Sequence, residues 1–510
     1  MHPESYLPAA SAECPTFVDD SEWLPLVDGE RYFAELDVAL KDLGRGDSVL
    51  IAGLELDTDL DLCGRRAGDP GYQPLGDRLL RAAATGARVR VLLAGKVSAQ
   101  RVPVPALKGF RDNVTTAHRL QSLRPDGWPA DAAPPLQGRV LVDWSGRMLG
   151  SHHQKVAVVD RGGELTAFVG GIDLVANRWD AVPHDRLRLR GRRWGWHDAA
   201  VRLRGPAATQ VHRALTQRWR EASTLPSRRY LDRSGHLVPM NPHPAAPALP
   251  PPAEQLPAGR PGTAVRVLRS MGPRKIDSPF PWRRAAWDHL PAGGYQEIHE
   301  TLTCALRAAR SYVYIEDQYL GEETGGDRRF ELYTDLRDAA ARGVKVILVG
   351  SGTRDPDDPG FRPVPINRVV NADLRHKILD RLDEPARARV VVYRIWRATV
   401  HSKLVLIDDR FACIGSANMF SRSMAGVDCE LATAVVSDST LVRDLRVQVW
   451  AEHLRVPLTG ELRAALEDPD RALGMWRADW APPGRAVSRP SASALREARE
   501  SWLPGRARRR

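Results

Sequence analysis

The chain has 510 residues, a formal net charge of +11 and a pI near 9.7, with 43% hydrophobic and 27% charged residues. These are ordinary values for a globular protein, and the length exceeds one ordinary domain but suits two packed halves. The positive charge favours an anionic partner, namely nucleic acid, a phospholipid surface or a phosphorylated small molecule. A solvated Arg-rich surface would give the same total.

The cysteines and the apolar runs bear on location. The five cysteines are odd in number and form no C-x-x-C, which argues against a disulfide framework or zinc ribbon and favours a reducing compartment. The first residues lack the basic and apolar regions of a signal peptide, and no apolar run approaches the roughly 20 residues of a membrane span. We therefore expect a cytoplasmic protein that is at most peripheral at a membrane.

The first half is predicted at residues 47–236, after an N-terminal lead-in at 1–46. The lead-in contains an apolar rhythm of helical period at Glu30–Leu43. A buried strand is predicted at Ser48–Leu56, and a helix then precedes a second strand at Val89–Gly95. This alternation favours a largely parallel sheet with helices on its faces.

The second half, predicted at residues 264–456, repeats these parts. A strand at Ser311–Leu320 is followed by a helix at Tyr333–Ala341 and a strand at Val344–Gly350. Both halves then reach a strand with an acidic residue and close with a helix ending Gln-x-Trp. The same landmarks in the same order predict an internal duplication.

Two further segments lie outside the halves. Residues 237–263 are rich in Pro and Ala and are predicted to be an extended linker, since proline disfavours helices and central strands. Residues 457–510 are predicted to be a C-terminal extension with a basic tail.

The most informative repeat is the pattern H-x-K-x-x-x-x-D. It occurs twice, at His153, Lys155 and Asp160 and at His401, Lys403 and Asp408. Residues two apart in a strand share a face, so each histidine is expected beside its lysine. Each aspartate lies an odd number of residues away, so we expect it to fix a turn and take no part in chemistry.

Two His-Lys pairs brought together suit phosphodiester chemistry. The lysines would hold the phosphate, and one neutral imidazole would attack phosphorus to give a phosphohistidine. The other imidazole, protonated, would give its proton to the leaving alkoxide and then act as a base. Because the lysines supply the positive charge, no metal or cofactor is required.

Coincidence is the competing explanation, since a single H-x-K is common. Lysine is scarce here, however, with eight residues in the chain, and two of them occupy matching places in the duplicated unit. A zinc site from His152 and His153 is disfavoured, because neighbouring strand residues point to opposite faces and no third ligand lies nearby.

At these residues the chain resembles the phospholipase D superfamily, which is defined by the duplicated motif. The resemblance runs from about residue 48 to 454 and includes the segments 171–174, 178–180, 196–198, 204–207, 314–319, 415–418, 422–424 and 428–430. It implies an α/β fold of two duplicated halves, each a mostly parallel mixed sheet flanked by helices, packed with pseudo-twofold symmetry. The first-half segments are similar to the lipid-cleaving enzymes rather than the short nucleases.

The resemblance also implies roles for residues. The two motif histidines would be the catalytic pair, with His153 attacking, and the two lysines would bind the phosphate. Asp198 and Glu430, at matching places on the acidic strands, would hold the imidazoles in the required tautomer.

Three residues after the motif strands are implied to line the phosphate pocket, namely Gly171, Ser416 and Asn418. Asp173 stands where the second half has an amide. A carboxylate there would repel the phosphate, so we expect its side chain to point elsewhere.

The leading hypothesis is a phospholipase D that hydrolyses the phosphatidyl group of a phospholipid or transfers it to an alcohol. A cardiolipin-synthase-like transferase and a nucleic-acid phosphodiesterase are alternatives, and a scaffold without activity is the least supported. The nucleic-acid alternative rests on the net charge and on Arg186, Arg188, Arg190, Arg192 and Arg193. We expect a monomer that acts on phospholipid at a membrane surface, without a stable nucleic-acid partner.

Overall fold

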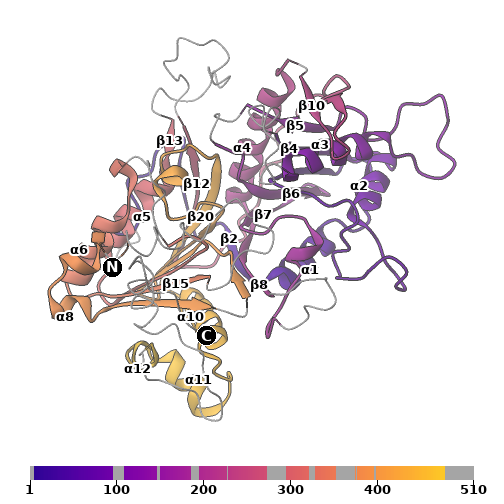
Figure 1. Ribbon diagram of the computed structural model, residues 1–510. Helices are drawn as coiled ribbons and strands as arrows, with labels where there is room; N and C mark the ends of the chain where they lie inside the picture. The colour runs from indigo at the N-terminus through magenta and orange to yellow at the C-terminus, as the bar shows by residue number, and fades with distance from the viewer. Residues whose placement is uncertain are drawn as a thin grey trace, which may run out of the picture.

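The computed structural model describes residues 5–95, 108–145, 150–184, 195–226, 228–272, 294–320, 328–351, 374, 376–395 and 398–476. Within these residues the two halves form two large mixed sheets, which Figure 1 shows side by side with helices around them.

The first sheet has seven strands in the described part of the chain. Their order is β2 (Glu22–Val27), β9 (Ala199–Arg204), β7 (Glu164–Gly170), β6 (Lys155–Arg161), β3 (Ser48–Gly53), β4 (Arg88–Ala94) and β5 (Val140–Asp143). Parallel pairing is confined to β3–β4–β5, and the remaining neighbours are antiparallel. The motif strand β6 is apolar on both faces, as expected of a strand covered on both sides.

The second sheet repeats this arrangement. Its order is β1 (Thr16–Val18), β12 (Thr263–Met271), β20 (Glu430–Ser437), β19 (Phe411–Gly415), β18 (Leu404–Ile407), β14 (Tyr312–Asp317), β15 (Lys345–Ser351) and β16 (Val390–Ile395), with β13 (Tyr295–Gln296) paired to β12. Here β14–β15–β16 are parallel. The predicted α/β fold with two helix-flanked mixed sheets is confirmed. Parallel pairing is limited to three strands on one side of each sheet, and antiparallel pairing is more extensive than the expected largely parallel sheet, because the motif strand and the strands after it follow one another as antiparallel neighbours.

Helices fill the layers around the sheets. The outer face of the first sheet packs against α1 (Gly29–Ala39), α2 (Leu75–Ala84) and α3 (Lys108–Ser122). The outer face of the second packs against α5 (Glu297–Ala308) and α6 (Tyr333–Ala341). The last helix of each half lies in the core between the sheets, α4 (Pro206–Ser223) and α10 (Leu441–Leu454).

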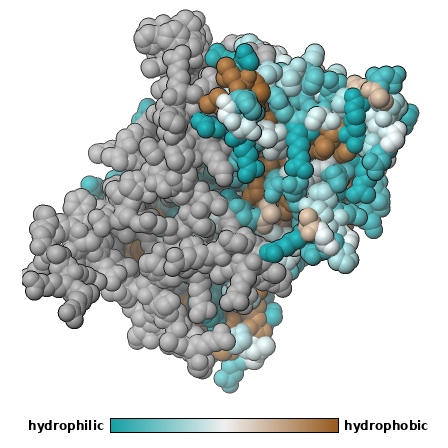
Figure 2. Space-filling view, turned by 45° about the vertical axis from the view of Figure 1, so that its right-hand side comes forward, coloured by the Kyte–Doolittle hydropathy of each residue, from teal (hydrophilic) through white to brown (hydrophobic). Residues whose placement is uncertain are grey.

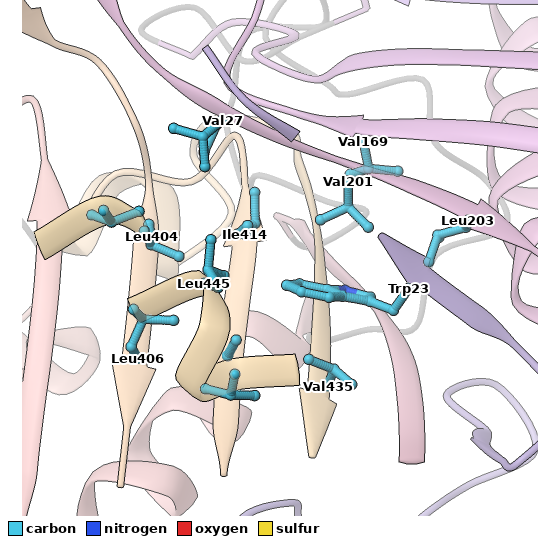
Figure 3. Packing of buried hydrophobic residues seen from close by; sticks show 14 of the residues in the cluster. Trp23, Val27, Val169, Val201, Leu203, Leu404, Leu406, Ile414, Val435 and Leu445 are labelled. Carbon is cyan, nitrogen blue, oxygen red and sulfur yellow. The ribbon is translucent and has the colours of Figure 1, made fainter. Parts of the chain in front are cut away.

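The two halves share one hydrophobic core. Figure 3 shows Val169, Val201 and Leu203 of the first sheet facing Ile414 and Val435 of the second. All five side chains are nearly fully buried. Burial of apolar area on this scale makes the two halves one folding unit, because each sheet covers the other's inner face.

The N-terminal segment belongs to both sheets. The strand β1 pairs with β12 of the second sheet, whereas β2 pairs with β9 of the first. The Trp23 indole donates a hydrogen bond to Thr433 Oγ1 across the halves, at 2.9 Å. The segment predicted as a lead-in therefore supplies a strand to each sheet.

Short elements complete the described structure. These are β8 (Gly195–His197), β10 (Arg229–Leu231), β11 (Leu237–Pro239), β17 (Ala398–Val400), α8 (Glu384–Arg387), α9 (Ser421–Met424), α11 (Gly460–Glu467) and α12 (Pro469–Met475). Residues 240–262 of the predicted linker form neither helix nor strand. Part of the predicted extension packs on the second half, where Trp476 is buried against Tyr314 and Trp450.

The surface is polar where it can be seen. Figure 2 shows the described surface on the right-hand side as mainly hydrophilic, with apolar residues in small separate patches. Within the described ranges, no helix combines the length and apolar character needed to cross a bilayer.

Candidate active site

The site forms where the ends of the two motif strands meet. The motif histidines lie just before their strands: His153 is two residues before β6 begins, and His401 is three before β18. Short parallel pairings hold both. The strands β8 and β17 pair with Val400 opposite His197, and His152 forms a bridge with Cys429. Each segment before a motif thus lies beside the segment before the acidic residue of the other half.

The first histidine is anchored by the second half. Nδ1 of His153 lies 3.0 Å from Glu430 Oε2 and 3.0 Å from the Ser416 carbonyl oxygen. A carbonyl has only acceptor capacity, so the proton is on Nδ1 and Nε2 carries a lone pair when the ring is neutral. The backbone N–H of His153 also donates to the Cys429 carbonyl, at 2.9 Å.

The second histidine is anchored by the first half in the same way. Nδ1 of His401 lies 2.7 Å from Asp198 Oδ2. Its backbone N–H donates to the His197 carbonyl, at 2.8 Å. Each half therefore supplies the acid that orients the histidine of the other half, a crossed arrangement that the matching sequence positions did not reveal.

The environments of the two imidazoles differ. The His153 side chain is 15% exposed and that of His401 is 7% exposed. Trp196 packs against His401 with ring centroids 4.9 Å apart. Burial and the charges on Lys403 and Arg178 lower the pKa of His401 to about 3, against the opposing effect of Asp198. His401 is therefore neutral in the free protein near pH 7.

The motif lysines lie at the same site. Each ammonium group donates to the carbonyl of its own motif histidine, Lys155 to His153 at 2.9 Å and Lys403 to His401. Burial lowers the pKa of Lys403, and the positive charge on Lys155 acts in the same direction.

Carboxylates balance the lysines, but they come from different positions in the two halves. Asp173 Oδ2 lies 3.4 Å from Lys155 Nζ, and its other oxygen accepts from the Glu55 N–H. Asp173 therefore lies beside the motif lysine of its own half, and its orientation relative to a bound phosphate stays a prediction. In the second half the matching place holds Asn418, and the charges on Asp198 and Asp317 both oppose the lowering of the Lys403 pKa by burial.

Asp317 mirrors Asp173 in its backbone contacts. It ends β14 and accepts from the N–H of Met419, the residue after Asn418, at 2.8 Å. Asp173 follows β7 and accepts from an N–H just beyond β3. The carboxylate has exchanged places between the ends of the two strands that flank the motif strand, while its hydrogen bond from one end to the other is preserved. Burial raises the pKa of Asp317, and the charge on Lys403 opposes this.

The three residues predicted to line the phosphate pocket occupy different places. The Ser416 hydroxyl is fully buried and donates to Glu430 at 2.6 Å. Gly171 matches Ser416 by position, and a side chain there would collide with Asp198, since a Cβ would lie 2.1 Å from Oδ1. Both therefore support the acids behind the imidazoles. Asn418 is buried, and its Oδ1 has no hydrogen-bond partner among the described residues.

The two motif aspartates lie at the far ends of their strands. Asp408 accepts from the backbone N–H groups of Arg310, Ser311 and Tyr312 and from the Tyr6 hydroxyl. Asp160 accepts from the Gly163 N–H at 3.1 Å. Both positions are consistent with a structural role, and Asp408 accepts more of these hydrogen bonds than Asp160.

Sequence reasoning missed the residues that support the motif segments from behind. Glu316 is fully buried and accepts from His197, His453, Tyr314 and the Ser402 hydroxyl. An acid in an otherwise apolar strand was the available signal for it. The five arginines at 186–193 lie outside the described residues.

Comparisons with known proteins agree with this geometry. The family model described as phospholipase D matches residues 44–190 and 185–339, and the one described as cardiolipin synthase, PLD-like domain, matches residues 302–451. The chain belongs to the phospholipase D superfamily. The matched residues include both H-x-K motifs, so the segments that show membership of the superfamily also carry the paired motifs.

Two curated relatives of the chain are plant proteins. Phospholipase D alpha 3 of Arabidopsis thaliana is 27% identical over 407 residues, covering 60% of this chain and 48% of that protein. Phospholipase D alpha 1 of Oryza sativa subsp. japonica is 25% identical over 559 residues, covering 84% of this chain and 65% of that protein. The chain thus spans about half to two thirds of the length of these relatives.

A solved superfamily structure shares the fold. Phosphatidylserine synthase of Haemophilus influenzae Rd KW20 superposes with a TM-score of 0.51 at 13% identity, covering 87% of this chain and 88% of that one. Similarity over both halves supports the two-sheet arrangement.

Proposed function

We propose that the protein is a phospholipase D-type phosphodiesterase that hydrolyses the phosphatidyl group of a glycerophospholipid or transfers it to an alcohol. The observation that carries the proposal is the crossed pair of imidazole–carboxylate contacts, His153 with Glu430 and His401 with Asp198, beside two buried lysines. Two oriented imidazoles and two ammonium groups are what metal-free transfer of a phosphoryl group requires.

The reaction would have two displacements at phosphorus. Nε2 of one neutral imidazole attacks, and the bond from phosphorus to the headgroup oxygen breaks as the other imidazolium protonates that oxygen. Water or an alcohol then attacks the phosphohistidine, giving its proton to the second imidazole and releasing the first. Lys155 and Lys403 would stabilise the charge on the non-bridging oxygens throughout.

The resemblance implies that His153 attacks phosphorus. His401 would then be the acid, and its pKa bears on that role. His401 is neutral in the free protein, so it must gain a proton before it can act as the acid. A phosphodiester anion between the lysines would favour that protonation, because an adjacent negative charge raises a histidine pKa. Identification of the phosphorylated residue by mass spectrometry after a rapid denaturing quench at alkaline pH, where the acid-labile phosphohistidine is stable, separates this assignment from the reverse.

The decisive test of function is a choice of substrates. The protein is incubated with phosphatidylcholine vesicles plus ethanol and, separately, with single-stranded DNA. We expect phosphatidic acid and phosphatidylethanol, with DNA intact. Cleaved DNA with untouched lipid would contradict the proposal and support the nucleic-acid alternative, and cardiolipin formed from phosphatidylglycerol would support the transferase alternative.

A further inference from the structure

A second cluster of buried ionisable side chains lies behind the candidate active site. It comprises Asp28, His184, His197 and Glu452, called here the four-residue cluster. All four side chains are at most 8% exposed. One ligand atom from each lies within 4.8 Å of all the others. The phosphodiester mechanism gives these residues no chemical role.

The distances resemble those between ligands of one metal ion. His197 Nδ1 lies 2.7 Å from Glu452 Oε1 and 3.1 Å from Asp28 Oδ1. His184 Nε2 lies 2.9 Å from the same Glu452 oxygen and 3.8 Å from Asp28 Oδ2. In a tetrahedral site with bonds of roughly 2.0–2.1 Å, neighbouring ligand atoms are about 3.3 Å apart. The observed spacings lie on both sides of that value.

The other ring nitrogens have the partners that metal-bound histidines usually have. His184 Nδ1 lies 3.2 Å from Asp180 Oδ2, and His197 Nε2 lies 2.9 Å from Glu316 Oε2. A metal-ligating histidine commonly donates its second N–H to a carboxylate, which fixes the tautomer. This arrangement leaves His184 Nε2 and His197 Nδ1 facing the two remaining carboxylates.

Ion pairing without a metal explains the cluster less well. Burial opposes protonation, yet Asp28, Asp180 and Glu452 raise the pKa of His184 to about 10, so two imidazolium ions could neutralise two acids. His197 Nδ1, however, is poorly aligned for a hydrogen bond with either of the two carboxylate oxygens that lie within 3.1 Å of it. An N–H that is poorly aligned with both oxygens gains less than a linear hydrogen bond would give, whereas a lone pair on the same nitrogen can be directed at a cation.

Backbone strain accompanies two of the four residues. Asp28 and His184 have φ angles of 67° and 61°, in the left-handed region that non-glycine residues seldom occupy. Such conformations persist where surrounding contacts over-determine them, and they gather at functional sites.

We propose that a divalent transition-metal ion, with zinc the best fit, binds between Asp28, His184, His197 and Glu452. Two imidazoles and two carboxylates at tetrahedral spacing suit zinc, and four protein ligands in a buried place make a closed, structural site. The ion would join three segments of the first half to α10 of the second. It would also fix the backbone next to Asp198, which orients His401.

The test measures metal on the full-length protein. Protein treated with a chelator is incubated with Zn²⁺, passed through a desalting column and analysed by inductively coupled plasma mass spectrometry. We expect about one zinc per chain and a rise in Tm of about 5 °C at a hundredfold excess over Kd. Glu452→Gln and His184→Gln should each weaken zinc binding at least tenfold.

The matched control is Glu221→Gln, since Glu221 occupies the place in α4 that Glu452 occupies in α10, two residues after the tryptophan. It should retain the zinc. Absence of zinc from the wild-type protein, or equal zinc in the Glu452→Gln and His184→Gln variants, overturns the proposal. If the variants do not fold, cobalt(II) decides: the wild-type protein should show the intense visible absorption of tetrahedral cobalt, and its absence overturns the site. These measurements need no turnover, so they are independent of the proposed function.

Discussion

The two motif regions have the same backbone frame but different side chains around it. In the first region His153 is oriented by a glutamate that a serine hydroxyl supports, whereas in the second His401 is oriented by an aspartate packed against a glycine. Glu430, the longer acid, accepts a hydrogen bond from the serine hydroxyl. Asp198, the shorter one, occupies the space that a serine side chain would need. The two halves therefore place a carboxylate at the same point beside the imidazole, but they use side chains of different length to do so.

The largest effects are expected from the two histidines, because the proposed mechanism needs both for one turnover. His153→Ala and His401→Ala should each lower kcat with phosphatidylcholine by at least roughly 10⁴-fold, without loss of folding by circular dichroism. Asp160→Asn serves as the control with near-normal turnover. Normal activity in either histidine variant would show that the halves do not share one site.

The crossed acids come next. Asp198→Asn and Glu430→Gln keep shape but can present an N–H to the imidazole, which disfavours the required tautomer. Each should reduce kcat by about 10²–10⁴-fold with little change in KM. A rise in KM at unchanged kcat would instead mean that the acids serve substrate binding.

The motif aspartates should differ in stability rather than activity. Asp408→Asn loses charge-assisted hydrogen bonds from three backbone N–H groups and one hydroxyl, and asparagine tolerates the local φ of 56°. We expect a loss of about 2–3 kcal/mol in the free energy of unfolding, against under about 1 kcal/mol for Asp160→Asn. Urea denaturation of both variants measures the difference, and equal losses would contradict the asymmetry.

The smallest effect concerns the exchanged carboxylates. Asp173→Asn removes the ion-pair partner of Lys155, so inorganic phosphate should inhibit about tenfold more strongly. Asp317→Asn should change the inhibition constant less, because burial already favours the neutral form of Asp317. A larger effect from Asp317→Asn would mean that a carboxylate limits phosphate binding at Lys403 rather than at Lys155.

Local sequence patterns predicted the parts of the fold but not the contacts between halves. The helix at Tyr333–Ala341 has the predicted bounds, and the buried strands begin within one residue of prediction. Both motif repeats and both acids were found because each is marked by its position in a repeated unit. The contact of each acid with the histidine of the other half was not predicted, since sequence spacing carries no information on which half packs against which.

Other features lacked a local signal altogether. Asp173 was judged by charge repulsion from a phosphate, whereas the nearest charge in the folded protein is a lysine. The residues of the four-residue cluster are dispersed from position 28 to 452, so they show no ligand spacing, and no metal is predicted from the sequence. The strands β1 and β2 are too short and too irregular in pattern to be assigned to two different sheets.

These two short strands bear on how the chain reaches its native state. The strand β1 pairs with residues about 250 positions later, and β2 with residues about 180 positions later. During synthesis β2 stays unpaired until Arg204 has been made and β1 until Arg266 has been made, and closing such long loops slows folding. The segment that precedes both halves in the sequence therefore gains its two partners only after the first half and the start of the second have been made.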